Sequence, residues 1–242
     1  MQEIILAPYN SQWPNLFVQE AEILKNIFKD LVIAIHHKGS TSVPNLMAKP
    51  IIDITIEVED IAQVCKLNQF LAAIGYDALG EYGMPLRRFF IKTNPQSYNL
   101  HVWDKGHAEI AKDLLFRDAL IQNSEVRATY ENLKKKLRDQ FQFDREQYIF
   151  GKDRLIKEIL RVAGYDGLSM VHVLLDAEKQ AYQNFMKEEP IPNKSLVVSQ
   201  GVTFIGAFSL DENDNVEQKN IISSHEQVEK LIDRWLQTKS SQ

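Results

Sequence analysis

The sequence contains a single cysteine and no long hydrophobic run. Cys65 stands alone among 242 residues, which excludes an internal disulfide and a zinc site built from cysteines. No apolar run approaches the ~20 residues that a membrane-spanning helix needs. The N-terminus has no basic segment followed by an apolar stretch, so we expect no signal peptide. These absences predict a cytoplasmic protein that does not bind membranes.

A broad basic surface is also missing. The formal net charge is −5, and residues 164–242 carry this excess, with 12 acidic and 7 basic side chains. Base-stacking aromatic residues do not alternate with a basic stripe, so we expect no binding to nucleic acid. Residues 133–161 do hold a local excess of 9 basic over 5 acidic side chains. Such an excess indicates a solvated helix face or, less often, a surface that faces an anionic ligand.

Hydrophobic periodicity predicts a fold that mixes helices and strands. The run 51–58 is apolar on one face and nearly so on the other, as in a sheet covered on both sides. The predicted strands are 31–36, 51–58, 76–79, 86–91 and 98–103, and the predicted helices are 14–29, 61–74, 106–122, 125–140 and 145–162. The pattern is typical of the α/β class, α+β in detail.

Glycines at 164 and 167 interrupt this pattern. We therefore predict one domain over residues 1–163 and an accessory C-terminal extension over residues 164–242. Within the extension the sequence predicts a helix over 168–187, two strands on either side of 211–215 and a closing helix over 224–237. We interpret the extension as a unit that covers a sheet edge or meets a partner chain, in which case the protein forms a homo-oligomer.

Residues 36–58 contain the most informative pattern. An apolar strand ends in a Gly-Ser-Thr-Ser turn at 39–42, and the next apolar strand carries Asp53. Glycine lets the backbone approach a phosphate closely, and the N–H groups of such a turn can donate to phosphate oxygens. A carboxylate on the next strand can hold a divalent metal that bridges these phosphates. The alternatives are an ordinary turn and, for Asp53, a salt bridge to Lys49 or to an arginine.

Several motifs follow one another along the chain: GSTSVP (39–44), AKP (48–50), IID (51–53), RRFFIK (87–92), NLHV (99–102), LFRD (115–118) and the pair Tyr148 and Lys152. As an ordered set they resemble the signature of the GrpB family, a branch of the nucleotidyltransferase superfamily. The opening residues 7–10, with Trp13 and Phe17, also fit this family. The resemblance covers roughly residues 1–163, and the ordered set is more specific than any single motif.

The resemblance implies a nucleotidyltransferase-like mixed sheet, mostly antiparallel, with helices packed mainly on one side. It also implies transfer of a nucleotidyl group from a nucleoside triphosphate to a small hydroxyl- or phosphate-bearing acceptor, assisted by Mg²⁺. In this interpretation Gly39, Ser40 and Thr41 hold phosphates, and Asp53 is the catalytic metal ligand.

One position departs from the pattern of catalytic nucleotidyltransferases. Those enzymes usually place two acids at i and i+2 of this strand, where both can hold a pair of metals ~3.5–4 Å apart. The second position is the neutral Thr55. Glu57 shares the strand face but lies ~13 Å from Asp53 at ~3.3 Å per residue. A rival interpretation is therefore a non-catalytic module that binds a nucleotide or a phosphorylated metabolite.

Four more side chains are candidate site residues. His101 is a substitute ligand or general base, or else a structural histidine. Arg88 and Lys92 share a strand face and could clamp a triphosphate. Lys49 is held extended by the proline that follows it, and it either reaches an anionic ligand across the turn or forms a structural ion pair.

Overall fold

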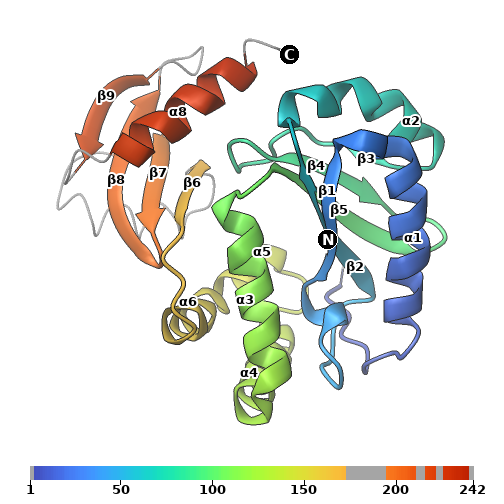
Figure 1. Ribbon diagram of the computed structural model, residues 1–242. Coiled ribbons are helices and arrows are strands. Elements are labelled where there is room, and N and C mark those ends of the chain that lie inside the picture. Colours follow the sequence, from blue (N-terminus) through green and yellow to red (C-terminus); the bar gives the residue numbers. More distant parts are fainter. Residues whose placement is uncertain (1–2, 173–194, 211–215, 222–225, 240–242) are drawn as a thin grey trace.

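The computed structural model describes residues 3–172, 195–210, 216–221 and 226–239 (Figure 1). Its first sheet has the strand order β1-β2-β5-β4-β3. The strands are β1 (Val32–Lys38), β2 (Ile51–Val58), β3 (Asp77–Ala78), β4 (Arg88–Lys92) and β5 (Ser97–Asp104). Strands β2 and β5 run parallel, and the other neighbours are antiparallel. The predicted α+β class with a mixed, mostly antiparallel sheet is confirmed.

One face of the first sheet forms the main hydrophobic core. Ile52, Ile54 and Ile56 of β2 are fully buried on this face, because side chains alternate between the two faces of a strand. Helix α1 (Trp13–Phe28), the 3₁₀ segment η3 (Ile61–Leu67) and α2 (Asn68–Ala73) pack against it. The predicted helix 61–74 is thus a 3₁₀ segment that continues into a short α-helix.

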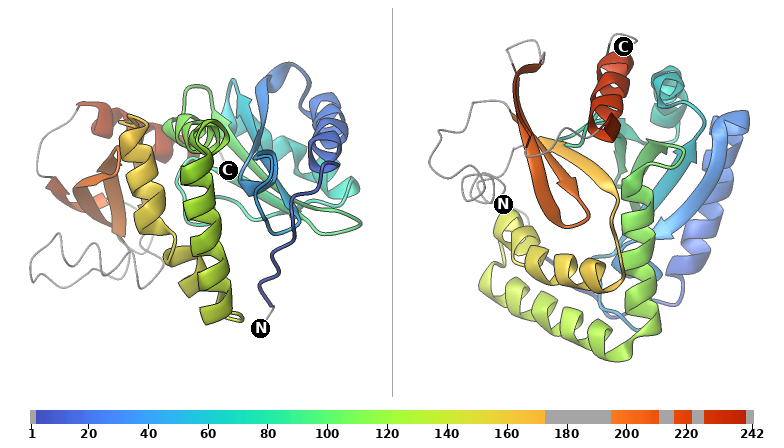
Figure 2. Two further views of the ribbon diagram at one scale, coloured as in Figure 1. Left: turned by 90° about the horizontal axis from the view of Figure 1, so that it is seen from below. Right: turned by 60° about the vertical axis from the view of Figure 1, so that its left-hand side comes forward.

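The opposite face of this sheet is polar. Residues paired directly across neighbouring strands share a face. By that register the face carries Lys38, Asp53, Thr55, Asn99 and His101. Helix α3 (Ala108–Gln122) lies against it, and Nζ of Lys38 donates to Asp113 of α3 at 2.5 Å. The first sheet therefore lies between α1 and α3, with α4 (Ser124–Gln140) and α6 (Asp153–Val162) beside α3 (Figure 2).

The chain between residues 145 and 162 forms two helices where the sequence predicts one. Helix α5 (Arg145–Phe150) ends before Gly151, and α6 starts two residues later. A Cβ atom at Gly151 would overlap Cδ2 of Leu137 in α4. The missing side chain allows the bend to approach α4 closely, and the bend carries Lys152 into the vicinity of Asp53.

The extension contains a second sheet, with the antiparallel order β6-β7-β8-β9. Its elements are β6 (Leu168–His172), β7 (Ser195–Gln200), β8 (Thr203–Leu210), β9 (Val216–Ile221) and α8 (Glu226–Lys239). The predicted helix 168–187 is wrong at its start, because residues 168–172 form strand β6. In this strand every second side chain, Leu168 and Met170, packs into the apolar cluster under α8. The rest of that helix lies outside the described residues. The strands expected around 211–215 are β8 and β9.

Polar contacts attach α8 to the first sheet. The Arg234 guanidinium donates to the carboxylates of Asp60 and Asp104 at 3.0 and 2.9 Å. The indole Nε1 of Trp235 donates to Glu81 at 3.0 Å, and Leu86 joins the apolar cluster of the extension. Among the described helices, none has the length and apolar character needed to cross a membrane.

Candidate functional site

The turn after β1 lies directly against the Asp53 carboxylate. Gly39 has φ 70° and ψ −172°, a conformation that residues with a side chain rarely adopt. A Cβ atom at this position would overlap Oδ2 of Asp53. The other carboxylate oxygen, Oδ1, accepts a hydrogen bond from Nδ2 of Asn99 at 2.8 Å. Antiparallel pairing places Lys38 opposite Asp53, so Gly39, the next residue in the chain, lies against the Asp53 carboxylate.

Two of the three hydroxyl groups of the turn, those of Ser40 and Thr41, differ in accessibility. Thr41 is buried, and its Oγ1 lies 3.1 Å from Nε2 of His37. Ser40 is only half-buried, and its Oγ accepts a hydrogen bond from Nζ of Lys134 at 3.0 Å. Of the two side chains that the sequence assigns to phosphate binding, Ser40 is therefore the one that a ligand can reach.

Three lysines from separate segments lie near Asp53, and Arg145 lies beside two of them. We call the four side chains the cation cluster: Lys49, Lys134, Arg145 and Lys152. Burial lowers the pKa of Lys134 to about 7, and the charge of Lys152 adds to this effect. Burial and the charge of Lys49 lower the pKa of Lys152 to about 8. Burial and the charge of Arg145 also lower the pKa of Lys49. Crowded like charges of this kind create a positive potential that favours an anion.

The Tyr148 ring holds two members of the cation cluster. The Nζ atoms of Lys49 and Lys152 lie 4.7 and 4.5 Å from its centroid, within the range of cation–π attraction. Neither lysine forms a salt bridge with a described residue. An aromatic face leaves the ammonium protons free to donate, so both side chains are available to an anionic ligand.

Asp53 is suited to sharing a metal with a ligand and not to holding one alone. The described residues contain no group of three or more His, Cys, Asp or Glu side chains that could bind a metal. Thr55, at the second-acid position, is 1% exposed and neutral. Mg²⁺ commonly binds one or two carboxylates and completes its six oxygen ligands with water and substrate phosphates. The side chains present fit an Mg²⁺ ion that arrives with phosphates.

Burial raises the pKa of Asp53, and three neighbours oppose that shift. The charge of Lys38 and the hydrogen bond from Asn99 both favour the ionised carboxylate, and so does the charge of Lys152 in the cation cluster. An ionised Asp53 therefore depends on the cations around it.

His101 lies farther along the same sheet face, paired with Thr55 across β2 and β5. Its Nδ1 is 3.3 Å from Nη1 of Arg87, and its ring packs on Phe89 with centroids 4.8 Å apart. Burial lowers the pKa of His101 well below its usual range, and the charges of Lys38 and Arg87 act in the same direction. The imidazole is therefore neutral and already has a hydrogen-bond partner within the protein.

Arg88 and Lys92 lie on the face of the sheet opposite Asp53. Lys92 donates to the Glu20 carboxylate at 2.8 Å, and Nε of Arg88 donates to Sγ of Cys65 at 3.4 Å. Both contacts lie under α1 and η3, so the structure does not bring these two side chains to the turn. The spacing in the sequence correctly indicates that they share a strand face, but it cannot say which face of the sheet that is.

Sequence reasoning did not identify Lys134 and Arg145 as members of the cation cluster. The available signal was the basic excess over residues 133–161, which we interpreted first as a solvated helix face. Lys134 is 2% exposed, so at that position the interpretation is wrong. The motif pair Tyr148 and Lys152 was the other signal, and the structure places both beside Lys49.

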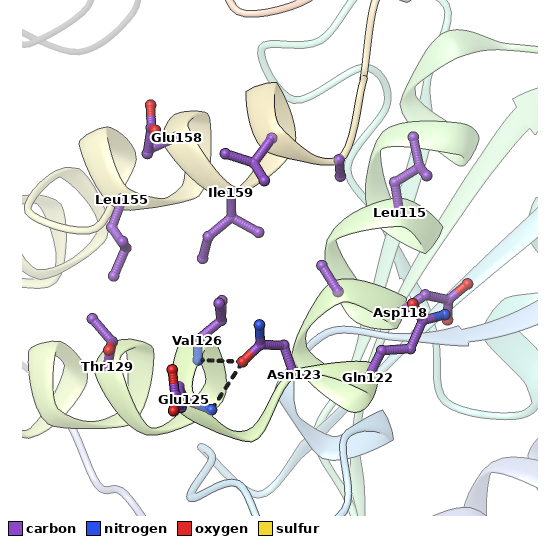
Figure 3. Close-up of a pocket in the computed structure, with 13 residues that line it drawn as sticks. Leu115, Asp118, Gln122, Asn123, Glu125, Val126, Thr129, Leu155, Glu158 and Ile159 are labelled. Carbon is purple, nitrogen blue, oxygen red and sulfur yellow. Dashed lines mark hydrogen bonds between the residues drawn. The ribbon is translucent and has the colours of Figure 1, made fainter.

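A cavity of about 620 Å³ lies elsewhere, between α3, α4 and α6 (Figure 3). Leu155 and Ile159 of α6 face Val126 and Thr129 of α4 across it. The residues that line it include no lysine, arginine or histidine. It lacks the cations that a phosphate requires, so the candidate site is the turn with Asp53 and the cation cluster.

Comparison with known proteins finds relatives that carry the same family designation, UPF0157. The UPF0157 protein YqkA of Bacillus subtilis is 44% identical over 156 residues, which are 64% of this chain and 45% of YqkA. The UPF0157 protein BH1888 of Halalkalibacterium halodurans is 36% identical over 161 residues, covering 66% of this chain and 82% of that protein. This chain thus spans less than half the length of YqkA.

A solved structure and a family model cover the same part of the chain. The crystal structure of the conserved protein GrpB from Enterococcus faecalis is 34% identical with a TM-score of 0.61, covering 74% of this chain and 99% of that one. The family model described as GrpB protein matches residues 3–162, which include the turn, Asp53 and the whole cation cluster. The chain therefore belongs to the GrpB family.

Proposed function

We propose that this site binds the phosphate chain of a nucleoside triphosphate or of a comparably charged phosphorylated metabolite. The cation cluster carries the proposal, because its three lysines lie near Asp53 and Arg145 adds its charge beside Lys49 and Lys152. Lys49 and Lys152 donate to phosphate oxygens, and the hydroxyl of Ser40 contacts the innermost phosphate. Gly39 has no side chain, so the ligand can approach the backbone N–H groups of the turn closely.

Nucleotidyl transfer to a small hydroxyl- or phosphate-bearing acceptor is the second candidate function. The position of Asp53 beside the Gly-Ser turn favours it, since this is where the first metal-binding acid of a nucleotidyltransferase lies. Thr55 favours a site that binds without two-metal catalysis, because one carboxylate alone supplies too few protein oxygens for two metals ~3.5–4 Å apart. Mg²⁺ would neutralise phosphate charge, and Asp53 would be its protein ligand.

ATP binding is expected to weaken as the pH rises from 7.5 to 9. In the free protein the pKa of Lys152 is about 8, so this side chain loses its proton over that range. A bound phosphate favours the charged lysine and raises its pKa, so complex formation takes up protons. The phosphates of ATP are ionised throughout this range. Calorimetry in two buffers with different ionisation enthalpies measures both the affinity and the proton uptake.

A matched pair of variants assigns this effect to the site. Lys152→Met removes a charged hydrogen bond worth about 1.5–3 kcal/mol, so we expect ~10- to 100-fold weaker binding and less proton uptake. Lys136→Met neutralises an exposed lysine on α4 and should leave both quantities unchanged. Absence of binding by ATP and by tripolyphosphate at millimolar concentrations, with and without Mg²⁺, would refute the proposed function.

Mg²⁺ binding is expected to depend on the nucleotide. Because Asp113 is already paired with Lys38, Asp53 is the carboxylate that we expect to bind the metal. We therefore expect weak binding of Mg²⁺ alone and clear binding when phosphates complete its oxygen ligands. Asp53→Asn keeps the size of the side chain but removes the charge, so it should abolish the nucleotide-dependent part. Calorimetric titration of Mg²⁺ with and without ATP measures this. If the variant binds Mg²⁺ and ATP as the parent does, Asp53 is a structural residue.

A further inference from the structure

Ser40 and Lys134 form a pair that phosphate binding alone does not require. The Nζ atom of Lys134 lies 3.0 Å from Oγ of Ser40 and also contacts the backbone oxygen of Met47. Lys134 is buried, whereas Ser40 is half-buried and accessible from the site. The ammonium groups of Lys49 and Lys152 lie against the Tyr148 ring, whereas that of Lys134 lies near the Tyr130 ring and also meets a hydroxyl group. Lys134 is thus the member of the cation cluster that is directed at a hydroxyl group.

We propose that Ser40 is a nucleophile and that Lys134 is its general base, with the phosphorus atom of the bound phosphate ligand as the electrophile. The choice of electrophile rests on the proposed function. An activated nucleophile needs a base ≈2.6–3.2 Å away, and that base is in turn oriented by a third group. The pair meets both conditions, because the Met47 carbonyl fixes Nζ from one side. The Tyr130 ring lies 5.4 Å from the same nitrogen, and its hydroxyl interacts with Ser40.

The surroundings of Lys134 support its role as a base. An ordinary lysine, with a pKa of about 10.4, is charged at neutral pH and cannot accept a proton. Burial lowers the pKa of Lys134 to about 7, so neutral and charged forms coexist near neutral pH. The charged groups that act on it are Lys152 and Lys49, which lower this pKa, and Glu131 and Asp53, which raise it.

The chemical step balances without a cofactor. Oγ of Ser40 bonds to the α-phosphorus of a nucleoside triphosphate, the bond from that phosphorus to pyrophosphate breaks, and the serine proton passes to Nζ of Lys134. Lys49 and Lys152 offset the charge on the phosphoryl oxygens. An acceptor hydroxyl or water then attacks the same phosphorus and releases its own proton to solvent, while Ser40 leaves and recovers its proton from Lys134. This route needs no second metal-binding acid, which agrees with Thr55.

Diisopropyl fluorophosphate tests the pair without the natural ligand. Attack by Ser40 forms an O–P bond and expels fluoride, and the added mass is localised by peptide mapping. We expect one label, at Ser40, with a rate that rises with pH and levels off above about 7 as Lys134 loses its proton. Lys134→Met should slow labelling by about 10²- to 10⁴-fold, the usual contribution of a general base. The control variant Lys136→Met should be labelled at the parent rate.

Ser40→Ala separates this inference from the proposed function. The variant should take no label, and it should bind ATP more weakly than the parent but measurably, because it loses the hydroxyl contact and keeps Lys49 and Lys152. If the parent takes the label at Ser40 but binds neither ATP nor tripolyphosphate, the proposed function fails and the pair stands. If the parent binds ATP but Ser40 is labelled no faster than other serines, the inference is overturned. An unchanged rate in Lys134→Met also overturns it. If Lys134→Met does not fold, the pH dependence of the parent decides: a labelling rate of the parent protein that does not change between pH 6 and 9 also overturns the inference.

Discussion

Gly39→Ala is expected to lower the free energy of unfolding by ~3 kcal/mol or more and to abolish ATP binding. The backbone at Gly39, with φ 70° and ψ −172°, costs a residue with a side chain about 1–3 kcal/mol. The new methyl group would also overlap Oδ2 of Asp53, so the buried carboxylate must leave its hydrogen bond to Asn99. Urea denaturation measures the loss, which corresponds to roughly 6–12 °C in melting temperature for a chain of this size.

Gly106→Ala is the matched control for this substitution. Gly106 has a similar φ of 71°, but no atom lies within 4 Å of the place where its Cβ would be. Its replacement should therefore cost only about 1 kcal/mol, the conformational part of the penalty. If Gly39→Ala and Gly106→Ala lose the same free energy of unfolding, the close contact between Gly39 and Asp53 does not contribute to the loss.

Thr55→Asp is expected to destabilise the protein by ~3–5 kcal/mol, the usual cost of a buried charge without a partner. Thr55 is 1% exposed beneath α3, and its Oγ1 has no hydrogen-bond partner. The nearest cation on β1, Lys38, is already paired with Asp113 at 2.5 Å. A total stability of about 5–15 kcal/mol makes this loss large enough to measure by urea denaturation.

Thr55→Val separates the effect of charge from that of shape. Valine has nearly the same shape as threonine and removes a hydroxyl that has no partner, so stability should stay the same or rise slightly. The affinity for Mg²⁺ is measured on the aspartate variant in parallel. A stable Thr55→Asp protein that binds Mg²⁺ more tightly would contradict our expectation. It would show that position 55 opens onto a metal site, and two-metal nucleotidyl transfer would then become the better account.

The outcomes for Asp53 and Arg88 show how far sequence reasoning reached. Gly39 and Asp53 were predicted to act together, and they touch because an antiparallel pair of strands brings the end of one beside the other. Arg88 and Lys92 were predicted to join them, yet they occupy the opposite face and contact Cys65 and Glu20. Strand periodicity groups residues by face, but the identity of the face depends on what packs there.

The C-terminal extension shows the same limit. A helix was predicted from residue 168, and Leu168–His172 instead forms β6 by pairing with β7. A short segment with mixed signals takes the structure that its partner strand imposes, because the hydrogen bonds and apolar contacts of pairing outweigh local propensity. The closing helix was predicted well, since its apolar positions recur at helical spacing and meet one cluster.

The sequence by itself determined the family, the sheet of mixed direction and the meeting of a glycine turn with Asp53. These follow from ordered motifs and from periodicities that act over a few residues. Only the tertiary structure decided which distant side chains complete the site. Lys134 reaches the turn and Lys152 comes near Asp53 because α4 and α6 pack beside α3, and because Gly151 lets the chain bend against α4. Packing between helices is set by side chains far apart in the sequence, so local patterns could single out these lysines but could not place them beside Asp53.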